Sequence, residues 1–179
     1  VRVHPCFPYT TLFLSFVADH RWGMFWSLGF IGNIKNEAFL KDIEWLTSAQ
    51  VKLSTGTSGN SEIPYYDHLA LVSGDANYND EAGIYPSQSG NEELSWEQTW
   101  ANNVGVSFGL YNRVNVNVDF YHKKTTNMLM LVPQSYAITG VGNRWDNIGA
   151  MMNRGVEIAI DGDVIRTKDF TWNLSANVS

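Results

Sequence analysis

Tyrosines gather between residues 60 and 93, in a stretch also rich in Gly, Asn, Asp and Ser. A tyrosine ring can stack on a sugar or a peptide while its hydroxyl hydrogen-bonds the same ligand. The same rings could instead pack within a loop or meet a covering partner. The candidates for contact with a ligand or a lid are Tyr65, Tyr66, Tyr78 and Tyr85.

Three glutamates, Glu92, Glu93 and Glu97, could supply the acid pair of a glycoside hydrolase. That reaction needs two carboxyl groups about 5–9.5 Å apart. The simpler interpretation is polar residues at the start of a strand, and we adopt it. Asp161, Asp163 and Asp169 lack the spacing of a calcium-binding loop. We therefore expect no enzyme.

The histidines carry no metal-site spacing, and we expect them in loops or on a wet interior surface. They are His4, His20, His68 and His122. The single cysteine, Cys6, cannot form an internal disulfide. The sequence contains no phosphate-binding glycine loop, nucleophile elbow or CxxC pair. We expect neither a metal nor a cofactor.

The composition disfavours a nucleic-acid partner and leaves a membrane possible. The net charge is -6, whereas phosphate-binding domains are usually basic. Charged residues make up 17% of the chain, below the roughly 25% of an average soluble protein. The longest apolar run, Leu12–Ala18, is far shorter than the roughly 20 residues of a membrane-spanning helix. A spanning β-strand needs only about 9–11 alternating residues.

The stretch Leu94–Pro133 predicts a β-hairpin with one apolar and one polar face. Its first strand runs from Trp96 to Leu110, and a tight turn at Tyr111–Arg113 leads to a second strand that continues through Met128–Val132. The apolar face holds Val104, Val106, Phe108, Val116, Val118 and Phe120. The polar face holds Asn103, Ser107, Asn115, Asn117 and Asp119.

The rest of the chain predicts further strands of the same kind. They cover residues 21–34, 50–58, 147–161 and 170–179. A short helix is expected after Asn36, where Phe39, Leu40, Ile43 and Leu46 have helical spacing. Residues 60–93 and 134–146 show no periodicity and are expected to be long loops. Short and long connections alternate, which is typical of outer-membrane β-barrels.

Residues 1–15 share no pattern with the remainder and resemble translated sequencing-adapter sequence. A signal peptide is the alternative, but Pro5 and Pro8 fit it poorly. We interpret residues 1–15 as a non-native leader and residues 16–179 as the part of the chain that carries its function.

Two all-β architectures fit these strands: part of a barrel with apolar residues facing lipid, or a soluble β-sandwich that binds carbohydrate. The polar face is dominated by Asn, Ser, Gly and Thr, which suits a wet barrel interior. Aromatic residues near strand ends suit the membrane interfaces: Trp22, Trp96, Trp100, Phe170 and Trp172. Arg154 interrupts an apolar face, so either a bulge at Asn153–Gly155 turns it inward or it snorkels at an interface.

Several segments closely resemble the SusC/RagA-like TonB-dependent outer-membrane transporters of Bacteroidetes. They are Arg21–Ser27, Thr57–Asn60, Tyr85–Gln88, Leu94–Glu97, Asn147–Gly149, Asn153–Glu157 and Asp169–Asn173. The resemblance covers roughly residues 19–179, in order. It implies the later part of a 22-stranded barrel in the cell outer membrane, surrounded by lipid.

In that family, energy-coupled import of an oligosaccharide, or in some members a peptide, is the expected activity. The resemblance implies a SusD-like surface lipoprotein as a lid, and TonB pulling on an internal plug. Neither a plug nor a TonB box is recognisable in these 179 residues. The expected function is therefore that of a wall segment, with an oligosaccharide as the expected substrate.

Overall fold

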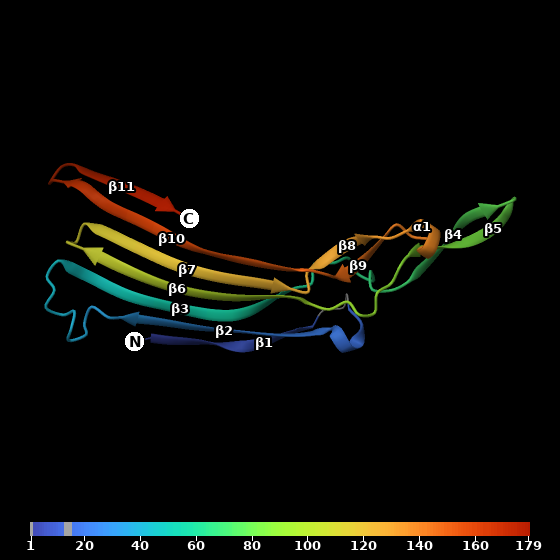
Figure 1. Cartoon of the computed structure of the whole chain (residues 1–179), viewed down its shortest axis with the longest axis horizontal. Helices are drawn as coiled ribbons and strands as arrows, with labels where there is room; N and C mark the ends of the chain where they lie inside the picture. The colour runs from blue at the N-terminus through green and yellow to red at the C-terminus, as the bar shows by residue number, and fades with distance from the viewer. Residues whose placement is uncertain (1, 13–15) are drawn as a thin grey trace.

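One long antiparallel sheet organises the chain, and the computed structural model describes residues 2–12 and 16–179. The order of its seven strands is β1-β2-β3-β6-β7-β10-β11 (Figure 1). They are β1 (Arg2–Leu12), β2 (Trp22–Asn33), β3 (Leu46–Asn60), β6 (Glu97–Leu110), β7 (Val114–Thr126), β10 (Ala150–Arg166) and β11 (Thr171–Val178). Each pairs with its predecessor in the sheet, which confirms the up-and-down arrangement.

The strands are long enough to cross a bilayer. β3 has 15 residues, β6 has 14, β7 has 13 and β10 has 17, against the roughly 9–11 that a tilted spanning strand needs. No helix within the described residues is long and apolar enough to span a membrane.

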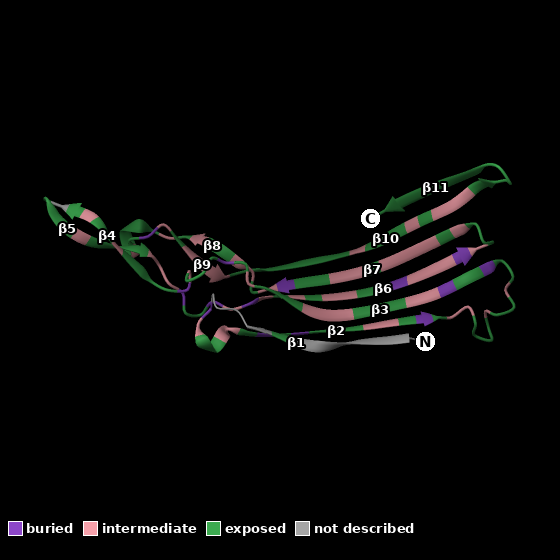
Figure 2. Cartoon of the chain, turned by 180° about the vertical axis from the view of Figure 1, so that it is seen from behind, coloured by how far each residue is buried: buried purple, intermediate pink, exposed green. Residues whose placement is uncertain are grey.

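The soluble β-sandwich alternative is wrong, because within residues 2–12 and 16–179 no second sheet covers the large one. The remaining elements are β4 (Leu71–Tyr78), β5 (Glu81–Gln88), β8 (Leu129–Pro133), α1 (Tyr136–Thr139), β9 (Asn143–Asn147) and the 3-10 turn η1 (Ala18–His20). The two hairpins β4–β5 and β8–β9 project beyond one end of the sheet instead of packing on its face (Figure 1). Buried residues are correspondingly sparse along the strands (Figure 2).

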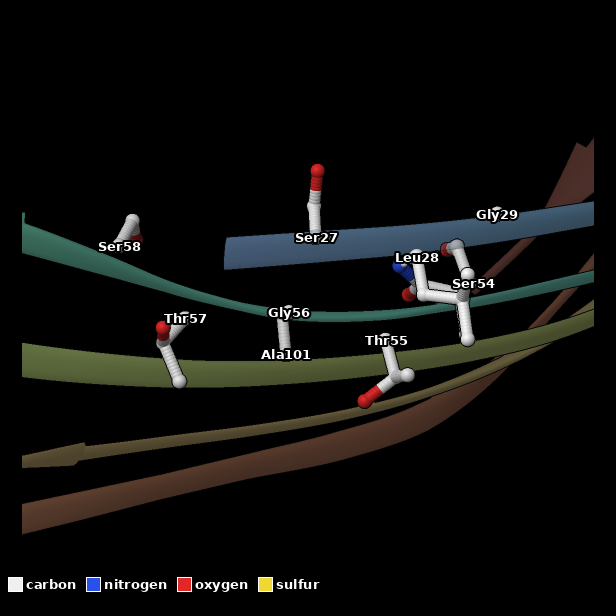
Figure 3. A pocket seen from close by; sticks show the side chains of 10 residues that line it. Ser27, Leu28, Gly29, Ser54, Thr55, Gly56, Thr57, Ser58 and Ala101 are labelled. Atoms are coloured by element: carbon white, nitrogen blue, oxygen red, sulfur yellow. Dashed lines mark hydrogen bonds between the residues drawn. The ribbon is translucent and has the colours of Figure 1, made fainter. Parts of the chain in front are cut away.

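The register sorts the predicted faces as expected. Val104 pairs with Phe120, Val106 with Val118 and Phe108 with Val116, so all six apolar residues share one face. Asn103, Ser107, Asn115, Asn117 and Asp119 share the other face. Figure 3 shows the same alternation further along the sheet, where Ser27 and Ser58 point to one side and Thr55 and Thr57 to the other.

Residues 60–93 contain more structure than the sequence indicated. β4 and β5 pair across Tyr78 and Glu81. Between them Asn79 and Asp80 both have positive φ, 53° and 64°, as a two-residue type I′ hairpin turn requires. The Asn-Asp pair was a usable turn signal. The sequence does not predict the strands themselves, because their pairing is irregular, with register shifts at Leu71/Val72 and Ser73/Ala76.

The prediction that the hairpin's second strand continues through Met128–Val132 is wrong. The strand stops at Thr126, and the chain bends at Asn127 (φ 54°) and opposite it at Gly149 (φ 89°). Ile148 donates its amide to Met128 across the bend, so the two chains stay paired there. They continue as β8 and β9, and the predicted loop 134–146 therefore includes α1 and part of β9. Only glycine adopts the Gly149 conformation without strain.

The short helix predicted after Asn36 is not formed; the segment consists of turns. Leu40 and Lys41 both donate their amides to Glu37 O, which closes one turn. The Lys35 ammonium donates hydrogen bonds to the carbonyl oxygens of Leu40, Lys41 and Ile43, at 2.8, 3.1 and 2.8 Å. The isolated segment is too short to sustain a helix, and this lysine stabilises a compact turn instead.

The first strand, β1, pairs with β2 from Arg2↔Ile31 to Leu12↔Trp22. The open edge of β2 offers unpaired N–H and C=O groups to any extended chain. The pairing of β1 with β2 therefore does not test whether residues 1–15 are native, and their non-native origin stays a prediction.

Candidate functional site

An aromatic cluster closes the end of the sheet from which the long loops leave. Trp96 lies between two rings, 5.7 Å from Phe16 and 5.4 Å from Phe25 between centroids, the latter edge-on. Ile63 and Leu94 complete the buried group, and Leu129 and Trp145 pack against it. Trp96 is only 7% exposed. The prediction of Trp96 as a membrane-interface aromatic is therefore wrong, whereas Trp22, Trp100, Phe170 and Trp172 are exposed.

Asn147 ties the two long loops together. Its side-chain amide accepts from Ser95 N at 2.8 Å and donates to Ser95 O at 2.9 Å. It also donates to Asn127 O at 2.9 Å. Two of these hydrogen bonds join residues 127–149 to the backbone of Ser95, as a neighbouring strand would, and the third lies within residues 127–149.

Asn91 and Glu97 add further links between the same loops. The Asn91 amide donates to Trp145 O at 3.0 Å and to Asp146 at 3.2 Å. The Glu97 carboxylate accepts from Leu129 N at 3.2 Å, a structural role. Glu92 and Glu93 are exposed on the surface. Within the part of the chain that the structure describes, no His, Cys, Asp or Glu triplet is suited to a metal ion.

The predicted tyrosines stand on two parts of the same loop. Tyr65 and Tyr66 precede β4 and are 68% and 64% exposed, and Tyr66 has a positive φ of 71°. The Gln88 amide holds this turn by donating to Tyr66 O and Leu69 O, both at 2.8 Å. Tyr85 is exposed on β5. The side chain of Tyr78 lies outside what the structure describes.

Large apolar side chains are exposed on the loop hairpins. Ile84 on β5 is 78% exposed and Ile138 in α1 is 85% exposed. The two hairpins approach each other, since a Cβ added at Gly140 would lie 3.4 Å from Pro86. Exposed apolar groups of this kind are candidates for contact with a partner.

The polar face of the sheet is joined by side-chain hydrogen bonds across strands. Asn103 donates to Ser54 at 3.2 Å, and Asn115 donates to Asp161 at 2.9 Å. Gly105, which carries no side chain, leaves room for the Asp119 carboxylate that leans over it. Over β2, β3 and β6 the small residues Ser27, Gly29, Ser54, Gly56, Ser58 and Ala101 help to line a hollow of about 460 Å³ (Figure 3).

Arg154 and His122 lie on the apolar face. β7 and β10 pair without any register shift from Ala150 to Gly162, so the predicted bulge at Asn153–Gly155 is absent. Arg154 pairs with His122, and Val156 pairs with Phe120 on the same face. The expectation of a histidine in a loop or on the wet interior is therefore wrong for His122, which lies on the face opposite to Asp119. His68 is buried in its loop at 6% exposure.

Asn91 and Asn147 were missed as functional residues by the sequence reasoning. Nothing in the local pattern distinguishes a loop asparagine that bridges two segments from one that meets water. Only Asn147 carried a signal, because it begins one of the segments on which the family resemblance rests.

The "TonB dependent receptor-like, beta-barrel" family profile matches residues 13–179. The TonB-dependent receptor P39 of Formosa agariphila is 36% identical over 159 residues, covering 88% of this chain and 15% of the relative. The TonB-dependent receptor SusC of Bacteroides thetaiotaomicron is 35% identical over 176 residues, covering 92% and 17%. The chain thus spans about one sixth of these relatives.

The RagAB peptide importer in its closed-closed state has a chain of the same fold. Its TM-score is 0.82 at 38% identity, covering 92% of this chain and 18% of the other. The siderophore receptor PirA of Pseudomonas aeruginosa has a TM-score of 0.54 at 16% identity, which is a likeness of fold alone. These relatives are receptors and transporters, and the chain is not an enzyme.

Replacing Asn147 by alanine should loosen both long loops without unfolding the sheet. Loss of three hydrogen bonds, two of them to Ser95, should cost about 1–3 kcal/mol locally. Amide hydrogen exchange in the full-length protein should speed up at 91–97 and 127–130. Asn143→Ala, which alters an exposed asparagine of β9, is the matched control. Equal exchange in both variants would contradict the bridging role.

Proposed function

We propose that this chain, which belongs to the TonB-dependent receptor-like β-barrel family, forms part of the wall of a transporter that imports a nutrient across the outer membrane. Barrels of this family lie in the outer membrane. The observation that carries the proposal is the unbroken register from β6 through β7 to β10, which separates an apolar from a polar face over the length of a bilayer. The plug and TonB contacts would belong to other parts of the protein.

The orientation follows from the connections. The short turns at 111–113 and 167–170 mark the periplasmic end, and the long segments 61–96 and 127–149 mark the extracellular end. Val104, Val106, Phe108, Val116, Val118 and Phe120 would face lipid. Asn103, Ser107, Asn115, Asn117 and Asp119 would line the wet interior. Asp119 lies directly opposite Glu157, an arrangement that water tolerates far better than hydrocarbon.

Neighbouring residues of β7 should report opposite surroundings. In the full-length protein in vesicles, a fluorophore on Val118→Cys should be quenched by lipids brominated in their acyl chains. A fluorophore on Asn117→Cys should instead be quenched by aqueous iodide. The two positions differ by one residue and share the same strand, so each is the control for the other. The reverse pattern would sink the assignment of the faces.

An oligosaccharide is the substrate that we propose, and a peptide is the second candidate. The likeness to SusC and the resemblance noted in the sequence support the first. The likeness to the RagAB peptide importer, at 38% identity, supports the second. Tyr65, Tyr66, Tyr78 and Tyr85, on the extracellular segment, would contact the ligand or the lid. Neighbouring genes for glycan-degrading enzymes or for peptidases would distinguish the two substrates.

Cells without the full-length gene should lose uptake of labelled oligosaccharides and keep uptake of labelled peptides. Uptake should return when the gene is restored, and should stop when a protonophore collapses the inner-membrane proton gradient. Loss of peptide uptake alone would replace the oligosaccharide by the second candidate. Unchanged uptake of both would remove the transport proposal itself.

A SusD-like lipoprotein is the partner that we propose for the extracellular end. The exposed Ile84 and Ile138 stand on adjoining hairpins, where a lid would bury them. Side chains buried at the centre of an interface contribute most of its binding energy.

The double change Ile84→Asp with Ile138→Asp should lower co-purification of the lipoprotein with the transporter by at least about tenfold, as expected for two central interface residues. Phe39→Asp changes an equally exposed residue at the opposite, short-turn end and should have no effect. If the Phe39 variant loses the lipoprotein as well, the assigned surface is wrong.

A further inference from the structure

Three basic side chains gather on the lipid side of the wall. Arg154 of β10 pairs directly with His122 of β7, and Lys124 lies two residues further along β7 on the same face. Cross-strand partners have Cβ atoms about 4.5–5.5 Å apart, and diagonal neighbours are within reach of long side chains. These residues therefore form one compact cluster, the basic cluster of Arg154, His122 and Lys124.

No acidic residue balances this cluster from within the wall. Among the described positions of β6, β7 and β10, the register places no Asp or Glu on the apolar face. The acids Asp119, Glu157 and Asp161 all lie on the other face. Across β6 the row continues with the neutral Asn102, which accepts a hydrogen bond from the Thr55 hydroxyl at 2.7 Å. The positive charges of Arg154 and Lys124 repel each other at this separation unless an anion from outside the wall lies between them.

The cluster lies at the outer edge of the apolar band. One pleat repeat beyond Arg154 the face becomes apolar, with Val104, Phe120 and Val156 in a single row. On β10 the apolar stretch from Val156 to Ile165 covers roughly 30 Å of strand. At a tilt of about 35–45°, that length gives roughly the 25 Å height of a barrel's apolar band.

Tryptophans bracket this band. Trp172 pairs with Ile165 at the periplasmic end, and Trp100 pairs with Lys124 at the other. Tryptophan favours the level of the lipid headgroups. The Arg154 guanidinium, whose charge would be costly in hydrocarbon, would thus reach the headgroup layer of the outer leaflet without a bulge.

We propose that the basic cluster of Arg154, His122 and Lys124 binds the phosphate of an anionic lipid headgroup in the outer leaflet. This proposal rests on the assignment of the apolar face to lipid. The guanidinium fork of Arg154 matches two phosphate oxygens, and Lys124 supplies a further positive charge. Acyl chains would continue down the adjoining row of Val104, Phe120 and Val156. A free phosphate ion would leave that row unused, which favours a lipid as the source of the phosphate.

A fluorophore on Met152→Cys would report on lipid at this site. Met152 is exposed, pairs with Lys124 and precedes Arg154 by two residues on the same face. The full-length protein is placed in phosphatidylcholine vesicles containing either brominated phosphatidic acid or brominated phosphatidylcholine. The ratio of quenching by the two lipids gives the local preference for the anionic headgroup.

Arg154→Gln and Lys124→Gln should each lower this preference about fivefold, the effect of removing one basic charge near an anionic lipid. Lys123→Gln is the matched control, because it removes the same charge from the same strand on the opposite face. Arg154→Lys keeps the charge but loses the fork, so it should lower the preference less than Arg154→Gln does, which separates charge from misfolding.

Three outcomes would overturn the proposal. One is an equal loss in the Lys123 and Lys124 variants, which would show attraction to overall charge. Another is the absence of any preference in the unaltered protein. The third is displacement of phosphatidic acid by millimolar inorganic phosphate, which would show a site for the free ion. If Val118→Cys is still quenched from the acyl chains, the wall assignment survives each of these failures.

Discussion

Continuous cross-strand pairing is the constraint on which the remaining structure depends. In hydrocarbon no water can satisfy a backbone N–H or C=O, so a spanning segment must pair every strand with a neighbour. β6, β7 and β10 meet this demand without one register shift between them. Because the side-chain period is two, the same register fixes which residues share the apolar face and which share the polar face. A single slip would exchange Phe120 for Asp119.

The two ends of the sheet are finished by different physical means. At the short-turn end, local contacts close the connections: Tyr111 and Asn112 adopt positive φ and Arg113 N donates to Leu110 O, while the Lys35 ammonium holds the turn between β2 and β3. At the long-loop end, side-chain contacts hold the segments together. Trp96 packs between Phe16 and Phe25, and Asn147 binds the backbone of Ser95. Interactions of this second kind join residues that are far apart in the chain.

The sequence predicted what depends on period and missed what depends on distant partners. Strict alternation located the wall strands and both faces within a few residues. The hairpin β4–β5 was missed because its pairing is irregular. The buried position of Trp96 was missed because it follows the same alternation as the exposed Trp100, and only contacts with Phe16 and Phe25 separate the two. Asn147 was overlooked as a bridge for the same reason, since its partner lies far away in the chain.

The unequal lengths of the connections bear on how such a wall assembles. β6 and β7 are joined through the turn at 111–113, whereas β3 must find β6 across the whole of residues 61–96. The entropy of closing that longer loop is greater by roughly 2 kcal/mol. The β6–β7 hairpin is thus the natural first unit, onto which β10 and β3 add as its two flanks. The long connections at one end of the sheet therefore also influence the order in which its strands can pair.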